Sequence, residues 1–263
     1  MPEIITSSSN PLVKQIRALR LHKPRQESGL FVVEGIHHVG EAIEAGWRIE
    51  TLAYAPDQLT SEFGRQLVEQ QIRHKGRCVA LSADLFSTVA DKENPQGILA
   101  VVHQQTRTLE QMTSENFKTG AALVSPQDPG NVGAILRSLD AVGADGLILL
   151  EGGVDPFHPV CVRASMGTIF WKQLAQASFV DFLQWARKNG YRLIGSSAHA
   201  KTGYRVYQPS AQATILVLGS EQKGLAHEQL AACDDTLSLP MNGRVSSLNL
   251  AVAAGILLYR LFD

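Results

Sequence analysis

A chain of 263 residues is long enough for two modest domains or one large one, and its 44% hydrophobic and 19% charged residues are ordinary for a globular protein. The net charge of −1 argues against nucleic-acid binding that depends on an overall basic excess. No apolar run approaches the length of a membrane span and the first residues do not read as a signal peptide, so we expect a cytoplasmic protein without a membrane partner.

The first hundred residues alternate between predicted strands and helices, beginning with an amphipathic helix before Pro24. Such alternation is typical of a small α/β domain with a core of its own. The predicted strands are residues 30–33, 51–55, 78–81 and 97–102, and the predicted helices between them are residues 36–45, 58–75 and 83–89.

The amino-terminal arm, from Met1 to Arg25, is locally basic, because it carries five Lys and Arg residues and a single acid, Glu3. Such an arm could bind RNA phosphates, although a solvated helix face explains the pattern equally well. The candidate RNA-binding residues are Lys14, Arg17, Arg20, Lys23 and Arg25.

A polar stretch without sustained periodicity, residues 105–118, predicts a linker between a domain of residues 1–104 and a second domain of residues 119–263. The second domain again alternates strands and helices, and a long polar loop covers residues 196–208. Its predicted strands are residues 121–124, 146–150, 191–195, 215–218 and 236–239, and its predicted helices are residues 131–142, 160–166, 179–188 and the terminal segment.

Metal binding is not expected from this sequence. The three cysteines are far apart, and the eight histidines include no pair four residues apart. Neither a disulfide framework nor a zinc site has the spacing that it needs.

The helix predicted at residues 131–142 has Asn131 as its N-cap and carries a second stripe of Gly133, Arg137 and Asp140 beside its apolar face. Gly133 leaves room for a ligand, and Arg137 offers five donors one turn above it. From this helix alone, an ordinary surface pair between Arg137 and Asp140 is the favoured interpretation.

Residues 219–224 form a glycine-bounded loop after an apolar strand, but they match neither a Walker loop nor a dinucleotide fingerprint. Glu221 in this loop could bind a ligand hydroxyl or a cation. It could equally be a turn acid that accepts backbone N–H groups.

The terminal helix presents an unexplained amide. Ser246 or Ser247 would cap it after the loop of residues 240–245, whereas Asn249 would then lie inside an apolar helix, where Asn is a poor helix former. We therefore expect a buried Asn249 that bonds to loop backbone or to a ligand. The helix is apolar on most sides, which predicts that it is central or packs against a second subunit.

Three ordered blocks, QDPGNVGAILRSLDAVGAD, VLGSEQKGL and LPMNGRVSSLNLAVAAGILLY, resemble the SpoU/TrmH family of ribose 2′-O-methyltransferases in the SPOUT class. The segment VDPFHPVCVRASMGTIF fits between the first two blocks. The amino-terminal half, with LFVVEG before a helix, looks like the family's ribosomal-protein-like α/β substrate-binding domain. The resemblance covers nearly the whole chain, but Ser220 and Gln222 stand where the family often shows Asn and Gly.

The resemblance implies an α/β protein whose carboxyl-terminal SPOUT domain has a parallel sheet and a trefoil knot. It also implies S-adenosylmethionine as methyl donor, RNA as acceptor and a homodimer. The positions that match the family's residues for catalysis and RNA placement are Asn131, Arg137, Glu221, Ser247 and Asn249. The positions that match its cofactor contacts are Leu218, Gly219, Leu239, Met241 and Leu248.

Ribosomal RNA is the expected acceptor rather than transfer RNA, because the extra amino-terminal domain and basic arm resemble those of the ribosomal branch of the family. Two further hypotheses come from other functional classes. A ribosome-assembly factor could retain the fold and bind RNA without catalysis. A nucleotide-dependent oxidoreductase would share the α/β layering, but its dinucleotide fingerprint is missing.

Overall fold

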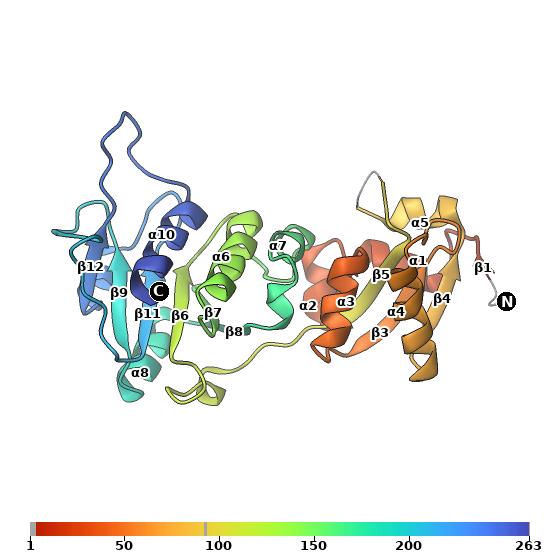
Figure 1. The fold of residues 1–263 in the computed structure, drawn as a ribbon, viewed down its shortest axis with the longest axis horizontal. Coiled ribbons are helices and arrows are strands. Elements are labelled where there is room, and N and C mark those ends of the chain that lie inside the picture. The colour runs from red at the N-terminus through yellow and green to blue at the C-terminus, as the bar shows by residue number, and fades with distance from the viewer. Residues whose placement is uncertain (1–3, 92–93, 263) are drawn as a thin grey trace. The chain divides into compact units, whose positions relative to one another are not determined.

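The computed structural model describes residues 4–91 and 94–262, and the chain forms two compact units (Figure 1). The first unit comprises Met1–Gln105 together with Phe157–Arg163, and the second comprises Thr106–Pro156 and Ala164–Asp263. Among the helices of the described residues, none combines the length and apolarity that a membrane span requires.

The first unit is built on a five-stranded sheet in the order β1-β4-β3-β5-β2. Strands β1, β4 and β3 are parallel, whereas β5 runs antiparallel to both of its neighbours, β3 and β2. The four strands predicted from the sequence are all present, and β1 is additional. The bounds are β1 (Ile4–Ile5), β2 (Leu30–Glu34), β3 (Ile49–Tyr54), β4 (Cys78–Leu81) and β5 (Ile98–His103).

Helices cover both faces of this sheet because alternate strand residues point to opposite sides. The apolar face of α1 (Pro11–Ala18) packs with α5 (Ala83–Val89) on one side, and α3 (Ile36–Glu44) and α4 (Glu62–Arg73) pack together on the other (Figure 1). The predicted amphipathic helix corresponds to α1. An unpredicted helix, α2 (His22–Ser28), follows it and accommodates Pro24 in its first turn, where no N–H is needed.

One segment of the first unit comes from the second half of the chain. The ring of Phe157 lies 4.8 Å from that of Phe31 and 6.3 Å from that of Trp47, measured between centroids. Burying such a ring stabilises the fold by roughly 1.5–3 kcal/mol, which explains why Phe157–Arg163 packs here. The predicted division had placed this segment with the second domain, because a contact over more than a hundred residues leaves no local pattern.

The predicted linker is mostly a structured part of the second unit. Residues 105–118 include the short 3₁₀ helix η1 (Leu109–Gln111), and Leu109, Met112 and Phe117 are buried in the core of that unit. A polar stretch with three widely spaced apolar residues has no regular period, so its packing could not be predicted.

The second unit contains a seven-stranded sheet in the order β10-β12-β9-β11-β6-β7-β8, in which all paired strands are parallel. The five predicted strands are present. The short β10 and the edge strand β8 were missed, and β8 (QLAQA) lacks the β-branched residues typical of strands. The bounds are β6 (Thr119–Val124), β7 (Gly146–Leu150), β8 (Gln173–Ala177), β9 (Arg192–Ser196), β10 (Thr202–Gly203), β11 (Thr214–Leu218) and β12 (Asp235–Ser238).

Two helices lie side by side on one face of this sheet, α6 (Pro129–Ala141) and α10 (Leu250–Phe262) (Figure 1). The opposite face buries the aromatic side of α8 (Phe179–Lys188). The short helix α9 (His227–Ala231) also belongs to this unit, whereas α7 (Pro159–Ala164) lies almost wholly in the segment that packs with the first unit. Because the strands are parallel, the loops after β6, β9, β11 and β12 emerge at the same edge, where ligand sites of such sheets form.

Candidate active site

Glu221 joins the loop after β11 to the start of α6. Its Oε2 accepts a hydrogen bond from the backbone N–H of Gln127 at 3.1 Å, and its Oε1 accepts one from Asp128 N–H at 3.4 Å. Oε1 also accepts the side-chain amide of Asn131 at 2.9 Å. Glu221 thus accepts backbone N–H groups, as one alternative expected, but they belong to a distant loop rather than to its own turn, and Glu221 also binds a second predicted site residue.

The pKa of Glu221 lies below its ordinary value. Partial burial acts to raise this pKa, but the hydrogen bonds from Asn131 and from backbone N–H groups, including those of Gln127 and Asp128, outweigh it. The carboxylate is therefore ionised at neutral pH, which suits a group that accepts several hydrogen bonds.

Asn131 does not cap α6, contrary to the sequence prediction. The helix begins two residues earlier at Pro129, and Asp128 is the cap, with its side chain accepting from Gly130 N–H at 2.7 Å. Asn131 is therefore free to face inward, and it is 7% exposed. It donates to Glu221 and accepts from the amide of Asn249 at 2.9 Å.

Asn249 is itself the cap of α10, so its predicted place inside the helix was wrong. Its Oδ1 accepts from Ala251 N–H at 2.9 Å and from Val252 N–H at 3.3 Å. Asn249 is exposed rather than buried, and Ser247 lies before the helix, also exposed. Asn249 bonds to the predicted site residue Asn131, which bonds to Glu221, and these bonds join α10, α6 and the loop after β11.

The loop after β11 turns so tightly that Gly219 cannot be replaced without a shift. A Cβ atom on Gly219 would lie 1.9 Å from the carbonyl carbon of Gly224. The turn is closed by the bond from Gly224 N–H to Ser220 O at 2.9 Å, and Ser220 Oγ accepts from Lys223 N–H at 3.3 Å. Ser220 therefore supports the turn at a position where it departs from the family pattern.

A cavity of about 460 Å³ lies against these loops, a size typical of small-molecule sites. All five predicted cofactor positions line it, together with Glu221 and Ser247. The predicted positions are Leu218, Gly219, Leu239, Met241 and Leu248.

The sequence analysis missed one wall of this cavity, which is formed by residues 196–199 directly after β9. Ser197 Oγ accepts from His199 N–H at 3.2 Å and shapes this turn, and His199 is exposed. The long polar loop that begins at residue 196 was a signal, but only the position of β9 in the sheet shows that it adjoins the cavity.

Arg137 does not line the cavity of its own chain. It lies six residues after Asn131, which places it about 9 Å along α6 and about 120° around it. The side chain is exposed and forms no hydrogen bond or ion pair within residues 4–91 and 94–262. Asp140 instead pairs with Lys172 at 2.9 Å, so the favoured Arg137–Asp140 surface pair was wrong.

The predicted basic arm is largely occupied by the fold. Arg25 is 1% exposed and donates to the carbonyls of Leu19 at 2.9 Å and Arg20 at 2.8 Å, so its assignment as an RNA contact was wrong. Arg20 donates to two carbonyls at the end of α5, and Arg17 donates to a threonine hydroxyl there. Only Lys14 and Lys23 of the five predicted cations extend from helix surfaces, and Lys23 lies 3.7 Å from Glu27.

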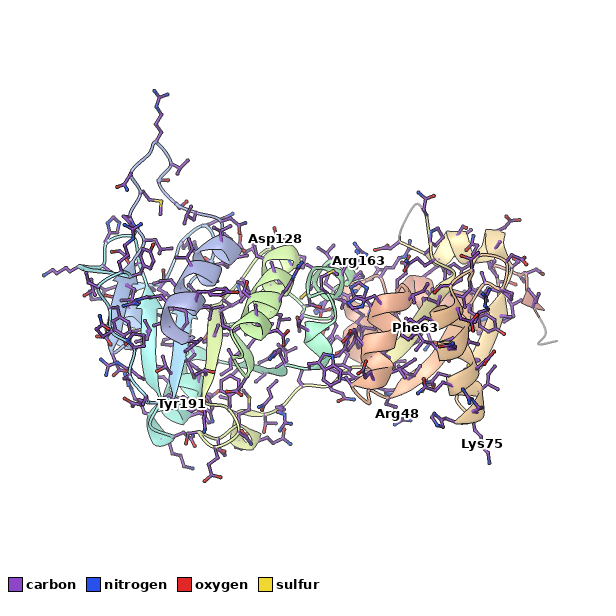
Figure 2. All side chains as sticks on the ribbon, viewed as in Figure 1. Arg48, Phe63, Lys75, Asp128, Arg163 and Tyr191 are labelled. Carbon is purple, nitrogen blue, oxygen red and sulfur yellow. The ribbon has the colours of Figure 1, made fainter. Side chains whose placement is uncertain are left out.

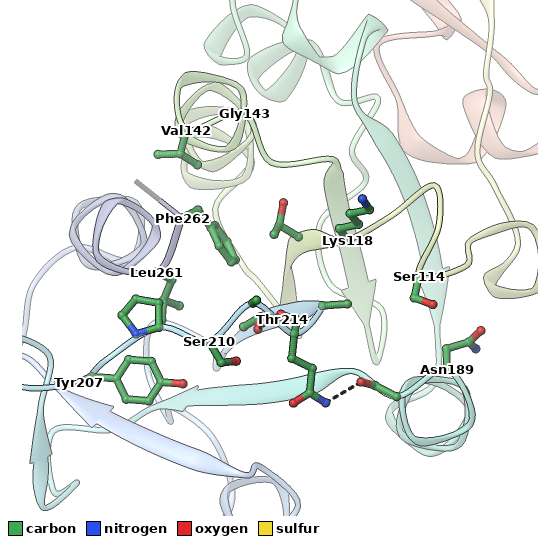
Figure 3. A pocket seen from close by; sticks show the side chains of 16 residues that line it. Ser114, Lys118, Val142, Gly143, Asn189, Tyr207, Ser210, Thr214, Leu261 and Phe262 are labelled. Atoms are coloured by element: carbon green, nitrogen blue, oxygen red, sulfur yellow. Dashed lines mark hydrogen bonds between the residues drawn. The ribbon is translucent and has the colours of Figure 1, made fainter.

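A larger cavity of about 650 Å³ lies at the other end of the same sheet (Figure 3). Lys118, Thr214 and Gly190 line it, at or just before the amino ends of β6, β11 and β9. Ligands of parallel α/β sheets bind at the carboxyl ends of the strands. The smaller cavity beside Glu221 is therefore the candidate active site.

Comparison with known proteins shows similarity over both units. Residues 118–259 match the model described as the SpoU rRNA Methylase family. Residues 10–100 match a model described as an MRM3-like substrate binding domain.

Individual relatives match the chain from end to end. A 23S rRNA (uridine(2479)-2′-O)-methyltransferase of Streptomyces viridochromogenes is 32% identical and aligns with 96% of this chain and 90% of its own length. A 23S rRNA (guanosine(2553)-2′-O)-methyltransferase of Bacillus subtilis is 30% identical, with 98% of each chain covered. The crystal structure of an AdoMet-bound rRNA methyltransferase from Sinorhizobium meliloti is 34% identical, with a TM-score of 0.89 over 98% of this chain and 96% of the other.

Proposed function

Because this chain belongs to the SpoU rRNA methylase family, and is therefore an S-adenosylmethionine-dependent RNA ribose 2′-O-methyltransferase, we propose that its acceptor is ribosomal RNA. Two relatives that match it from end to end are named for 23S rRNA, one for a uridine and one for a guanosine. These relatives therefore support a ribosomal substrate without specifying the base. An enzyme acting on ribosomes would work in the cytoplasm.

S-adenosylmethionine fits the cavity beside Glu221, in our proposal, and supplies a methyl group activated by its sulfonium. The observation that carries this assignment is the convergence of three loops, after β9, β11 and β12, on one cavity at the carboxyl edge of the sheet. The tight turn at Gly219 brings backbone groups to the cavity wall. Backbone around Leu218, Leu239 and Met241, with the side chain of Leu248, would hold the cofactor.

In methyl transfer the ribose 2′-oxygen would bond to the methyl carbon as the carbon–sulfur bond breaks with its electron pair staying on sulfur, and the hydroxyl proton would pass to water. Much of the barrier can be removed by holding the reacting atoms in line. We assign Ser247, which lies at the cavity wall, to orienting the ribose. The hydrogen bonds that join Glu221, Asn131 and Asn249 would hold that wall in place.

Arg137 holds the ribose and its phosphate in this scheme. A guanidinium is strongly basic and rarely gives up its proton, so a positioning role is favoured over that of a general base. Its planar donors suit a phosphate.

The enzyme is proposed to act as a homodimer through the second unit. Val252 and Tyr259 lie seven residues apart on α10, hence on one side of it, and are 50% and 51% exposed. Burial of this side against another copy would remove apolar surface from water. Since Arg137 is exposed and does not line its own cavity, a dimer would allow it to reach the cavity of the partner.

The family's trefoil knot is also part of the proposal. In support, β11 lies between β6 and β9 although it follows both in the chain, and β12 then crosses to the far side of β9 before α10 returns to pack on α6.

Methylation of unmodified 23S and 16S rRNA transcripts and of bulk transfer RNA, with labelled S-adenosylmethionine, tests the acceptor. We expect label in one ribosomal transcript, mapped as a 2′-O-methyl group, and none with Arg137→Ala. Label in transfer RNA alone would contradict the ribosomal assignment. Binding of S-adenosylmethionine without transfer to any of these RNAs would favour the non-catalytic assembly factor.

Mixed dimers test whether Arg137 acts across the interface. Arg137→Ala and Glu221→Gln chains are each expected to lose most of their activity, and Arg137→Ala loses more. If Arg137 serves the partner's cavity, a mixed dimer contains one complete site and regains activity. If Arg137 serves its own chain, both sites stay defective and mixing has no effect.

A further inference from the structure

Four cations gather along one edge of the first unit, where β3 and β4 begin, and we name them the basic edge: Arg48, Arg73, Lys75 and Arg77. Arg73 ends α4, and Lys75 and Arg77 occupy the turn from α4 into β4. Arg48 directly precedes β3, which runs parallel to β4. Figure 2 shows Arg48 and Lys75 along the same edge of this unit.

The backbone of the basic edge is fixed while its side chains extend into solvent. The carbonyl of Arg77 accepts from Leu52 N–H at 2.9 Å, and the carbonyl of Arg48 accepts from His103 N–H at 3.0 Å. All four cationic side chains are exposed. The sheet therefore sets the spacing of these cations.

No acid of the described residues pairs with the basic edge. Residues 70–83 contain neither Asp nor Glu. Within the part of the chain that the structure describes, none of the four side chains forms an ion pair or hydrogen bond. The neighbouring carboxylate of Glu50 is engaged with His103 at 3.0 Å. This contrasts with the predicted arm, where Arg25 and Arg20 are bound to backbone carbonyls.

Lys75 adds an independent observation. It has a φ of 59°, in the left-handed region, at the position just past a helix end where glycine is usual. Glycine adopts this conformation without steric cost, whereas a lysine does not. The fold alone would thus be served better by glycine, and the lysine contributes charge instead.

We propose that the basic edge binds the phosphate backbone of the RNA substrate. This inference rests on the proposed function, since it assigns the RNA contact of the substrate-binding unit. Unpaired Lys and Arg side chains attract phosphates by charge and displace the counterions around them. The contact is therefore expected to position the RNA without reading its sequence.

Matched double variants of the full-length enzyme test the basic edge. Arg73→Gln/Arg77→Gln removes two of its cations, and Lys14→Gln/Lys23→Gln removes two from the arm. With an unmodified 23S rRNA transcript, the first variant is expected to raise Kd and KM by roughly tenfold or more. It should also make the slope of log affinity against log salt shallower by about 2, one for each lost phosphate contact. Its kcat at saturating RNA and its affinity for S-adenosylmethionine should stay at the wild-type values, and the arm variant should lose less affinity for the transcript than this variant.

Lys75→Gly separates folding from binding. Because it relieves the left-handed conformation, its Tm should equal or exceed that of the wild type, while its affinity for the transcript falls and its salt slope becomes shallower by about 1.

The outcomes distinguish this inference from the proposed function. Wild-type affinity and salt slope in the Arg73→Gln/Arg77→Gln variant, or a larger loss in the arm variant, would overturn the basic edge even if the enzyme methylates the transcript. Failure of the wild type to methylate ribosomal RNA while it still binds the transcript through the basic edge would instead contradict the proposed acceptor. A wild type that does not bind the transcript at all would overturn both.

Discussion

Glu221 and Arg137 belong to one predicted site, yet the fold treats them in opposite ways. Glu221 accepts three hydrogen bonds that join two segments of the second unit, whereas Arg137 bonds to none of the described residues. The first unit repeats the contrast between buried Arg25, held by carbonyls, and exposed Arg77. A charged side chain that forms its hydrogen bonds within the protein helps to define the fold. A charged side chain without such partners is available to the substrate.

Arg137→Ala should produce the largest effect if this contrast holds. We expect kcat to fall by roughly 10²–10³-fold, the usual loss when one donor to a reacting group is removed. Because Arg137 is exposed and unbonded, the Tm and the affinity for S-adenosylmethionine should be unchanged. Thermal unfolding and calorimetric titration beside the rate measurement would reveal the alternative, a structural Arg137 whose loss lowers the Tm.

Arg137→Lys distinguishes positioning from proton abstraction. A lysine keeps the charge but loses the planar pair of donors, so a positioning role predicts a large loss of kcat with the same pH profile. Retained turnover with a profile shifted to lower pH would instead indicate that the side chain at this position takes the proton, because an amine gives up its proton more readily than a guanidinium.

Glu221→Gln should reduce kcat/KM by a smaller factor, roughly 10–100-fold, because hydrogen bonds to a charged group are each worth about 1.5–3 kcal/mol. A glutamine presents an NH₂ group where Gln127 or Asp128 needs an acceptor. Unlike Arg137→Ala, this variant should also lower the Tm. An unchanged Tm with full loss of activity would show that Glu221 acts on the substrate rather than on the fold.

The pH dependence of stability offers a second test of Glu221. Its pKa is lowered, so its ionised form stabilises the fold fully above the ordinary glutamate pKa of about 4.3, and this contribution is lost as the pH falls through the lowered folded-state pKa. The Tm difference between wild type and Glu221→Gln should therefore be constant from pH 7 to about 4.3 and shrink below it. A difference that shrinks near neutral pH would contradict a lowered pKa.

Local pattern was sufficient to predict most elements of the fold. Residues 83–89 and 179–188 begin after serine caps and carry apolar residues at helical spacing, and both helices have the predicted bounds. The apolar run of residues 146–150 likewise matches β7. By contrast, Phe157–Arg163 joins the first unit through contacts that no local window contains.

The residues of the site were predicted better than their contacts. Asn is a good helix cap, so the sequence could not show that Asn249 caps its helix while Asn131 does not. The role of Asn131 depends on Glu221, which is 90 residues away and accepts a hydrogen bond from its side-chain amide. Hydrogen bonds between segments so far apart in the chain leave no local pattern in the sequence.

Asn249→Ser separates the two roles of this side chain with a modest effect. Serine is also a good cap, so the helix start should lose no more than a few tenths of a kcal/mol. Its hydroxyl is too short to reach Asn131, and the loss of that bond should lower kcat/KM by about fivefold, the equivalent of about 1 kcal/mol. Asn249→Ala, which loses both roles, is the matched comparison and should lower the Tm as well. If the Ser and Ala variants are equally active and only the Ala variant has a lower Tm, the bond from Asn249 to Asn131 contributes to activity and the cap contributes to stability.

Asp140→Asn should have the smallest effect, although it lies on the same helix as Arg137. Its partner is Lys172 at 2.9 Å, and the Asp140 side chain is about half exposed to water, so the pair contributes about 0–1 kcal/mol. The sequence alone had paired Asp140 with Arg137, and in that case removing its charge would release Arg137 and change kcat. In this fold Lys172, which lies between the end of η2 (Thr168–Phe170) and the start of β8, pairs with Asp140, and Arg137 pairs with no described residue. We therefore expect kcat and its pH profile to stay at wild-type values.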